Sequence, residues 1–347
     1  MSAEFARRWL PFTPSLNRMI LADLPGAPAG VAGTRANDWL TTWSIARHLA
    51  ADADLLEEAR GIRPGLATLP SAPEVTAELM DAAIDYPAAL DALLAPSGRH
   101  RTDPASALAR RLGTILGLLL ATVTIGPEET RRAHGEWPAQ HWERWAEVRR
   151  IALGGGVLRG RLGVVMTDSA SRFLAGLASP VRLVLVDDPR SLVLRGAAHR
   201  IGEGIALDCG GSTIKRAVAR RGRPGDIDTV PAPGRVAAEE VIETIAVAAA
   251  PLIATWPGPD PVPLSLAIAT YVDPDGQPYA DQLGPYAPLG NLDAPAALRA
   301  ASTRHTDRAV EVLLAHDGAS ALSGARAEAP DTDAAVVLGT ALGSGLA

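Results

Sequence analysis

The segment A-L-D-C-G-G-S-T-I-K-R-A-V-A-R, residues Ala206 to Arg220, is the most informative part of the sequence. A short apolar run, Gly204 to Leu207, leads into Asp208. Two glycines, two hydroxyl residues and Lys215 follow, and a second apolar run comes after them. This pattern predicts a strand, a tight turn and a returning strand.

The residues of the turn suit an anionic ligand. Gly210 and Gly211 carry no Cβ, so their backbone N–H groups can approach an anion closely. Ser212 and Thr213 add hydroxyl donors to the same turn. Asp208 stands directly before the turn, where its carboxylate can hold a metal-bound water.

The distribution of basic residues points to the same turn. The chain has 33 lysines and arginines, and every one of them except Lys215 is an arginine. An ammonium group is a compact point charge that suits a phosphate, whereas a guanidinium is a broad fork. We therefore interpret the segment as a phosphate-binding turn. A plain β-hairpin with a chance lysine is the alternative.

Composition limits the class of protein. A length of 347 residues predicts two lobes, and a net charge of −6 with intermixed signs argues against a nucleic-acid partner. The single cysteine, Cys209, excludes an intramolecular disulfide framework. The longest apolar run, Leu112 to Gly126, is shorter than the roughly 20 residues that span a bilayer. The N-terminus lacks the apolar core of a signal peptide. We therefore expect a soluble cytoplasmic protein without a membrane partner.

The chain changes character near Arg149. Before that point the patterns predict helices, which we place at 37–49, 73–94 and 104–124. The segment His134 to Trp145 has two histidines and two glutamates in or beside it without a recognised ligand spacing, so we interpret it as a packed segment rather than a metal site. After Arg149, strands and helices alternate, which predicts α/β layers with sites at the carboxyl ends of strands. A long loop rich in proline, glycine and tyrosine, Tyr271 to Asn291, has the length of a functional loop.

Two further glycine clusters and one aspartate complete a set with the opening turn. Gly154-Gly155-Gly156 follows a predicted strand and begins a helix, where a nucleotide can approach closely. The segment Gly339 to Gly345 offers a second group of backbone donors for phosphate. Asp317, after the predicted strand 309–314, can accept the proton of a substrate hydroxyl that attacks a γ-phosphoryl group.

These segments resemble the ASKHA superfamily of kinases and ATPases, and most closely the ROK sugar kinases. Asp208-Cys-Gly-Gly-Ser-Thr-Ile-Lys is similar to the family's phosphate-1 turn, D-x-G-G-T-x-x-K. His316-Asp317-Gly-Ala-Ser-Ala-Leu resembles N-D-A-N-A-A-A, in which the aspartate is the catalytic base. Three other segments also match: Ala267 to Gly276 resembles the segment G-I-A-x-P-G-x-V-D-x-x-G, Val336 to Leu346 the phosphate-2 turn, and Ile151 to Val157 the adenosine-side segment I-V-L-G-G-G-V. Gly196-Ala-Ala matches the family's late G-A-A helix.

The order of these motifs differs from the family's order. Residues 105–200 resemble a family C-terminus, and residues 201–347 resemble its N-terminal half. We interpret this as a circular permutation, with a fused fragment as the competing account. The resemblance implies a two-lobed, actin-like (ribonuclease H-like) α/β fold with a helical N-terminal region. We expect residues 1–200 to form a larger lobe, 201–312 a smaller lobe with the phosphate-1 turn, and 313–347 to return to the larger lobe.

The resemblance implies an ATP-dependent kinase that transfers the γ-phosphoryl group to a hydroxyl of a sugar-like small molecule. Asp317 would be the general base, and Asp208 would bind Mg²⁺. Asp273 and His316 would contact the acceptor, although His316 alternatively caps the helix that follows it. The residues expected to bind ATP are Asp208, Gly210, Gly211, Ser212, Thr213, Lys215, Gly339, Thr340, Gly343, Ser344, Gly154, Gly155 and Gly156.

Several departures from the family leave the acceptor undefined. His316 stands where the family has asparagine, and Ala341 replaces the middle glycine of phosphate-2. The family's E-x-G-H sugar motif and its cysteine-rich zinc segment are both absent from residues 1–70, where the permuted order would put them. Two alternatives therefore stay open: a nucleotide-binding regulator or actin-like ATPase without an acceptor, and a scaffold that no longer binds ATP. A homodimer also stays open.

Overall fold

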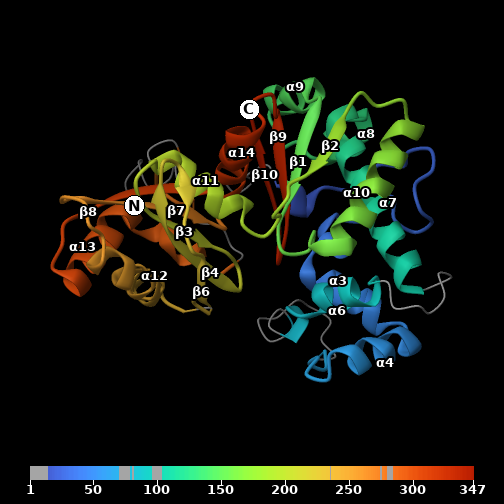
Figure 1. Cartoon of the computed structure of the whole chain (residues 1–347). Coiled ribbons are helices and arrows are strands. Elements are labelled where there is room, and N and C mark those ends of the chain that lie inside the picture. The colour runs from blue at the N-terminus through green and yellow to red at the C-terminus, as the bar shows by residue number, and fades with distance from the viewer. Residues whose placement is uncertain are drawn as a thin grey trace. The chain divides into compact units, whose positions relative to one another are not determined.

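The structure is a computed structural model that describes residues 15–69, 79, 82–95, 104–234, 236–273, 276–279 and 284–347. Within these ranges the chain forms two compact units (Figure 1). Unit 1 comprises Ser191–Pro330, and unit 2 comprises residues 15–190 together with Asp331–Ala347. Each unit contains one β-sheet and its own hydrophobic core.

The sheet of unit 1 contains the hairpin predicted at Ala206 to Arg220. Its strands are β3 (Gly204–Cys209), β4 (Thr213–Arg220), β5 (Arg223–Pro224), β6 (Asp228–Pro231), β7 (Val262–Ile268) and β8 (Val310–His316). They are arranged in the order β5-β4-β3-β7-β8, and β6 also pairs with β4. The β3–β4 pair is antiparallel, whereas β3–β7 and β7–β8 are parallel. The predicted strand, turn and returning strand are thus confirmed.

Side-chain size differs between the two faces of β3. Ile205, Leu207 and Cys209 belong to the main core of unit 1, together with residues of α12 (Ala238–Ala254) and α13 (Ala294–Thr306). Residues in a strand alternate between faces, so Ala206 and Asp208 lie on the other face. The helix α11 (Leu192–Ile201) contacts β3, β4 and β7. Asp208 is therefore buried without belonging to the large apolar core.

Two glycines bring α11 close to α14 (Asp317–Glu328). A Cβ on Gly196 would overlap the backbone carbonyl of Ser320, and a Cβ on Gly324 would lie 2.5 Å from the carbonyl oxygen of Leu192. This contact explains a difference from the expected lobes. We predicted that residues 313–347 return to the larger lobe, but 313–330 belong to unit 1, as do 191–200, because α14 packs on α11.

The sheet of unit 2 combines strands from the middle and the end of the chain. Its strands are β1 (Arg150–Gly154), β2 (Arg182–Leu185), β9 (Ala334–Leu338) and β10 (Leu342–Leu346), in the order β10-β9-β1-β2. The β9–β10 pair is antiparallel, and β1 is parallel to both β9 and β2. We predicted a turn over the whole of Gly339 to Gly345. Only residues 339–341 connect the strands. Residues 342–346 form a strand despite their glycines, because they pair with β9.

Helices form most of the remainder of unit 2. They are α2 (Asn37–Leu40), α3 (Thr42–Ala50), α4 (Ala53–Ile62), α6 (Tyr86–Leu93), α7 (Pro104–Ile125), α8 (Glu128–Ala133), α9 (Ala139–Glu147) and α10 (Gly160–Gly176), with the short η1 (Leu16–Arg18). Unit 1 also has η2 (Ala287–Asn291) within the predicted long loop. The helix predicted over 37–49 is interrupted at Thr41, whose side chain and that of Ser44 form a capping box at the start of α3. Of the helix predicted over 73–94, residues 73–78, 80 and 81 lie outside the described ranges.

The helix α7 is the apolar segment that the sequence predicts to be buried. Among the described residues it is the one helix long and apolar enough to cross a membrane by length and composition, and 67% of that window is buried inside the structure. It packs along α10, where a Cβ on Gly113 would lie 2.5 Å from the carbonyl oxygen of Met166. The predicted core helix is confirmed.

The two sheets share one plan. In unit 1, the first strand of the hairpin β3–β4 pairs in parallel with β7, and β7 pairs in parallel with the edge strand β8. In unit 2, the first strand of the hairpin β9–β10 pairs in parallel with β1, and β1 pairs in parallel with the edge strand β2. A helix, α13 or α10, joins the last two strands in both units. The chain order differs: in unit 1 the hairpin precedes the other two strands, whereas in unit 2 it follows them.

Candidate functional site

The predicted phosphate turn of unit 1 contains a buried ion pair. Asp208 and Lys215 are directly opposed in the β3–β4 ladder, and the Nζ atom of Lys215 lies 2.6 Å from Oδ2 of Asp208. The carboxylate side chain is 6% exposed and that of the lysine is 19% exposed. The single lysine of the chain therefore compensates a carboxylate that is almost fully removed from water.

The turn itself is held by backbone hydrogen bonds. Gly210 N–H donates to the carbonyl oxygen of Thr213, and Ala232 N–H donates to that of Ser212. The hydroxyl of the buried Tyr286 donates to the carbonyl oxygen of Gly210 at 3.0 Å. In the described part of the chain, the hydroxyl groups of Ser212 and Thr213 have no such partner, so both stay available as donors.

Electrostatics connects the turn to Asp317. Burial raises the pKa of Asp208, the Lys215 ammonium opposes that rise, and the negative charge of Asp317 adds to it. The last effect requires Asp317 to lie near Asp208. The fold therefore brings together two of the carboxylates that the sequence analysis selects, one at the end of β3 and one at the start of α14.

Asp317 is the first residue of α14 and has an unsatisfied oxygen. His316 Nε2 lies 3.0 Å from Asp317 Oδ1, but their geometry makes no hydrogen bond, and Oδ1 is buried without a hydrogen-bond partner. The His316 ring stacks on Tyr271, with 4.5 Å between ring centroids and 13° between planes. The His316 side chain makes no capping hydrogen bond to α14. Of the two roles considered for His316, capping by its side chain is not observed.

The carboxylates of Asp208 and Asp317 fit a magnesium–nucleotide complex. Magnesium is usually bound by one or two carboxylates plus substrate phosphates and water, rather than by a complete protein cage. No cluster of three or more metal-ligating side chains occurs among the described residues. Asp208 at the phosphate turn and Asp317, whose Oδ1 accepts no hydrogen bond from the described residues, provide the one or two carboxylates that this mode of binding needs.

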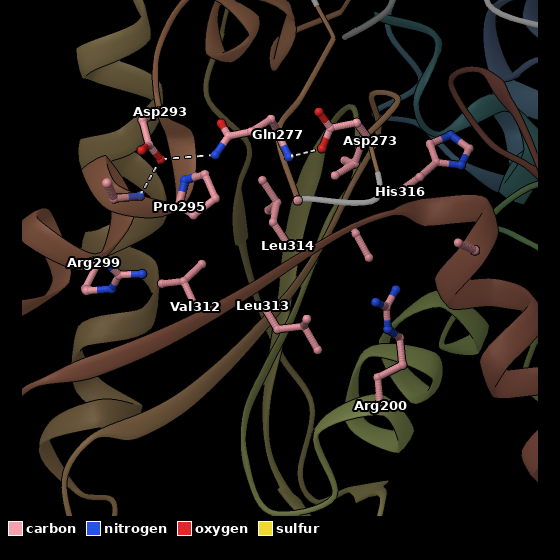
Figure 2. Close-up of a pocket in the computed structure, with 15 residues that line it drawn as sticks. Arg200, Asp273, Gln277, Asp293, Pro295, Arg299, Val312, Leu313, Leu314 and His316 are labelled. Carbon is pink, nitrogen blue, oxygen red and sulfur yellow. Dashed lines mark hydrogen bonds between the residues drawn. The ribbon is translucent and has the colours of Figure 1, made fainter.

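Asp273 organises the loop that follows β7. Its Oδ1 accepts a hydrogen bond from Gln277 N–H at 2.8 Å, and the Gln277 side chain donates to Asp293 Oδ1 at 3.2 Å. Asp273, Gln277 and Asp293 line a cavity of about 640 Å³ that also includes His316 (Figure 2). Asp273 and His316, the two residues expected to contact an acceptor, thus line one pocket.

The second predicted phosphate turn, in unit 2, is held from both sides. Gly339 N–H donates to the carbonyl oxygen of Ala341, and the Gly339 carbonyl accepts from Thr42 N–H at 2.8 Å. The side chain of Asn17 makes two hydrogen bonds with the backbone of Leu342. Gly343 and Ser344 belong to the β9–β10 ladder and not to the turn, so the turn proper contains Thr340 and its two neighbours.

The Gly154–Gly156 turn lies against this second turn. Gly155 has a φ of +102°, and a Cβ there would overlap the backbone of Leu338, the residue before Gly339. Val157 N–H donates to the Leu338 carbonyl oxygen at 3.1 Å. The fold thus brings together two glycine segments that are far apart in the sequence.

The start of α10 differs from the prediction that a nucleotide can approach there. Asp91 Oδ1 accepts a hydrogen bond from Leu162 N–H at 2.9 Å, and the Asp91 carboxylate lies where a Cβ on Gly160 would be. A carboxylate of the protein itself therefore occupies the helix N-terminus, which otherwise attracts anions. The sequence does not signal this contact because Asp91 lies on α6, far away along the chain.

Sequence reasoning missed several residues that support the two turns. Tyr286 holds the phosphate-1 turn, Tyr271 stacks on His316, and Asn17 and Thr42 hold the phosphate-2 turn. No local pattern identifies these contacts, since each joins residues from distant parts of the chain. The proline- and tyrosine-rich composition of the 271–291 loop was the only signal for the two tyrosines.

Comparison with known proteins gives limited likeness. No protein-family model matches the chain, and no curated protein matches it. Among solved structures, an inorganic polyphosphate/ATP-glucomannokinase from Arthrobacter sp. strain KM matches 42% of this chain and 58% of its own, at 27% identity and a TM-score of 0.34. The ethanolamine utilization protein EutJ from Carboxydothermus hydrogenoformans matches 60% of this chain and 75% of its own, at 16% identity and the same TM-score. The chain thus spans less than two thirds of the glucomannokinase.

Proposed function

We propose that the protein is an ATP-dependent phosphotransferase that moves the γ-phosphoryl group of ATP to a hydroxyl of a sugar-like small molecule. The observation that carries this proposal is the Asp208–Lys215 pair beside a glycine turn, with Asp317 close enough to influence the same carboxylate. A phosphate-binding turn and a separate carboxylate at a strand end are the groups that such a transfer requires.

Asp317 acts as general base in this proposal. The acceptor oxygen attacks the γ-phosphorus, the bond from that phosphorus to the bridging oxygen of ADP breaks, and the hydroxyl proton passes to the Asp317 carboxylate. The buried Oδ1 of Asp317 has no hydrogen-bond partner among the described residues, and this supports the role because such an oxygen is ready to accept a hydrogen bond from the acceptor.

The glycine turn of unit 1 binds the terminal phosphates of the nucleotide in this proposal. Its donors are the hydroxyl groups of Ser212 and Thr213 and the backbone N–H groups that follow Gly210, because Gly210 N–H already donates to the Thr213 carbonyl oxygen. Asp208 would hold Mg²⁺ through its bound water, and the ion would neutralise charge on the phosphates. The Lys215 ammonium opposes the rise that burial causes in the pKa of Asp208 and so favours the ionised carboxylate.

The arrangement of the sheets supports a circularly permuted actin-like fold. The same hairpin-plus-two-strands plan occurs in both units, but in unit 2 the hairpin comes last in the chain. Moving chain ends from one loop to another produces this order without changing strand pairing.

A measurement of ADP release tests the catalytic proposal. The protein with Mg-ATP and a panel of sugars, cyclitols and related hydroxyl compounds should release ADP faster with at least one acceptor. Asp317→Asn should lower that rate about 100- to 10,000-fold, the usual contribution of a general base. Mg-ATP should still raise its melting temperature, because binding does not need the base. The exposed Asp226→Asn is the matched control and should retain full activity.

One alternative function has a specific feature in its favour. The family's sugar-recognition motif is absent from residues 1–70, as expected of an ATPase without an acceptor. Slow ATP turnover that no acceptor accelerates, and that survives Asp317→Asn, would establish that alternative and exclude the kinase.

A further inference from the structure

The cavity of unit 1 follows an open edge of the sheet. β8 is the last strand of its sheet, and in the described part of the chain it forms a ladder with β7 alone. The cavity is lined by consecutive residues of this strand, from Val312 to His316. Its volume of about 640 Å³ is within the usual range for pockets that bind small molecules. The cavity therefore begins at the candidate catalytic end of β8 and continues along the free strand edge.

Two arginines from different helices line this cavity. Arg200 lies at the end of α11 and Arg299 lies on α13. Figure 2 shows them on opposite sides of the β8 ribbon. Neither side chain has a hydrogen bond or ion pair with any described residue. Burial lowers the pKa of the Arg200 guanidinium.

Each of the two described aspartates that line the cavity accepts a hydrogen bond from a backbone N–H group. Asp273 Oδ1 accepts a hydrogen bond from Gln277 N–H, and Asp293 Oδ1 accepts from Ala296 N–H at the start of α13. Both carboxylates thus stabilise local backbone structure. Among the described residues, neither guanidinium group of the cavity is paired with an acid, and such groups suit a carboxylate or a phosphate.

Helix packing places Arg200 near the candidate base. Gly196 lies against Ser320 and Leu192 lies against Gly324, so α11 and α14 are antiparallel. Arg200 is four residues beyond Gly196, or about one helical turn, and it therefore approaches the start of α14, where Asp317 lies. Ala319 lines the same cavity as Arg200, in agreement with this arrangement.

We propose that this cavity binds an acceptor that carries an anionic group, a carboxylate or a phosphate ester, through Arg200 and Arg299. The inference rests on the proposed function and narrows its acceptor to hydroxyl compounds with such a group. The reacting hydroxyl would lie at the His316 end, next to Asp317, and the anionic group would lie farther along the cavity, within reach of a guanidinium group that lines it.

Pairs of probes that differ only in charge test this inference. Glucuronate with glucose, glycerate with glycerol, and glucose 1-phosphate with glucose are compared by calorimetry without ATP and by ADP release with Mg-ATP. At least one anionic member should bind more tightly than its neutral counterpart. Arg200→Gln and Arg299→Gln should each weaken that binding about tenfold or more, the usual contribution of a hydrogen bond to a charged group. Arg304→Gln, on α13 but paired with Glu243, is the matched control and should bind like the original protein.

The outcomes separate this inference from the proposed function. Anion binding that depends on both arginines, without any ADP release, would support the anion site and contradict the kinase. ADP release with neutral acceptors that is unaffected by either arginine substitution would support the kinase and overturn the anion site. An acidic peptide that binds along β8 while every small anion fails would also overturn it, since the open edge would then be a strand-pairing surface.

Discussion

Lys215 Nζ lies 2.6 Å from Asp208 Oδ2, and both side chains are largely buried in the β3–β4 hairpin. The ammonium group of the lysine thus compensates the charge of the aspartate. Removing one member of such a pair leaves an uncompensated buried charge, which usually costs more than removing both. The lysine is therefore part of the stability of the turn as well as of its charge.

We expect Lys215→Met to reduce the free energy of unfolding by about 3 kcal/mol at neutral pH, because Asp208 would then be buried without a partner. The double variant Asp208→Asn/Lys215→Met should recover much of that loss. Urea unfolding of the two single variants and the double variant measures the coupling. A double variant no more stable than Lys215→Met would show that the pair does not compensate charge.

The loss of stability in Lys215→Met should decrease as the pH is lowered. Burial already raises the pKa of Asp208, and loss of Lys215 removes what opposes that rise. When the pKa of a carboxyl group is higher in the folded state than in the unfolded state, the group does not reduce stability at a pH below its unfolded-state pKa. It reduces stability as the pH rises from there through its folded-state pKa. The stability difference between Lys215→Met and the original protein should therefore shrink as the pH is lowered toward 4.

Gly155 should not tolerate a side chain. Its φ of +102° is unfavourable for other residues, and a Cβ would overlap the backbone of Leu338. We expect Gly155→Ala to destabilise unit 2 by about 3 kcal/mol or more, from backbone strain and overpacking together. Gly156→Ala is the matched control, because its Cβ would meet only the Arg159 guanidinium at 4.0 Å, and it should change stability little. Equal melting temperatures for the two variants would contradict the close contact between the two glycine turns of unit 2.

His141 should make unit 2 sensitive to mild acid. Burial and the nearby Arg144 lower the pKa of His141 to about 4. Its ring contacts Trp137 edge-on, and its Nε2 accepts a hydrogen bond from the Trp145 indole, which a protonated ring cannot do. The unfolded chain binds this proton at a higher pH, so stability is present at neutral pH and is lost as the pH falls from about 6.5 toward 4.

A thermal-unfolding series measures this effect. The original protein should lose about 1 kcal/mol between pH 7 and pH 5 through this group, after allowance for the partial exposure of the ring. His141→Gln should show a smaller loss over the same range, whereas the exposed His199→Gln should behave like the original protein. A His141→Gln protein with unchanged acid sensitivity would exclude the histidine as its origin.

Much of the fold follows from patterns that are local in the sequence. The β3–β4 hairpin, the buried helix α7 and the alternating elements after Arg149 occur close to where the sequence predicts them. Strand alternation, helical periodicity and glycine turns act over a few residues, so they are visible without the fold. The segment Leu342–Leu346 was misjudged because its glycines favour a turn, whereas pairing with β9 decides its structure.

The residues of the candidate site were found by motif, but their arrangement was not. Asp208 and Asp317 were both selected from the sequence, and the fold brings their charges together. The Asp91 contact at the start of α10 and the Tyr286 contact at the phosphate turn were not predicted. Both join residues from distant parts of the chain, where no periodic pattern exists to reveal them.

The amino-acid sequence alone identifies the chemical groups of this protein: a glycine turn with the single lysine, an aspartate at a strand end, and two further glycine segments. Which of these groups meet depends on the tertiary fold. The fold pairs Lys215 with Asp208, leaves Asp317 Oδ1 without a hydrogen bond from the described residues, and places Arg200 and Arg299 in the cavity beside β8. The physical reason is that turns and strands depend on short-range hydrogen bonds and sterics, whereas burial and charge pairing depend on packing between distant segments.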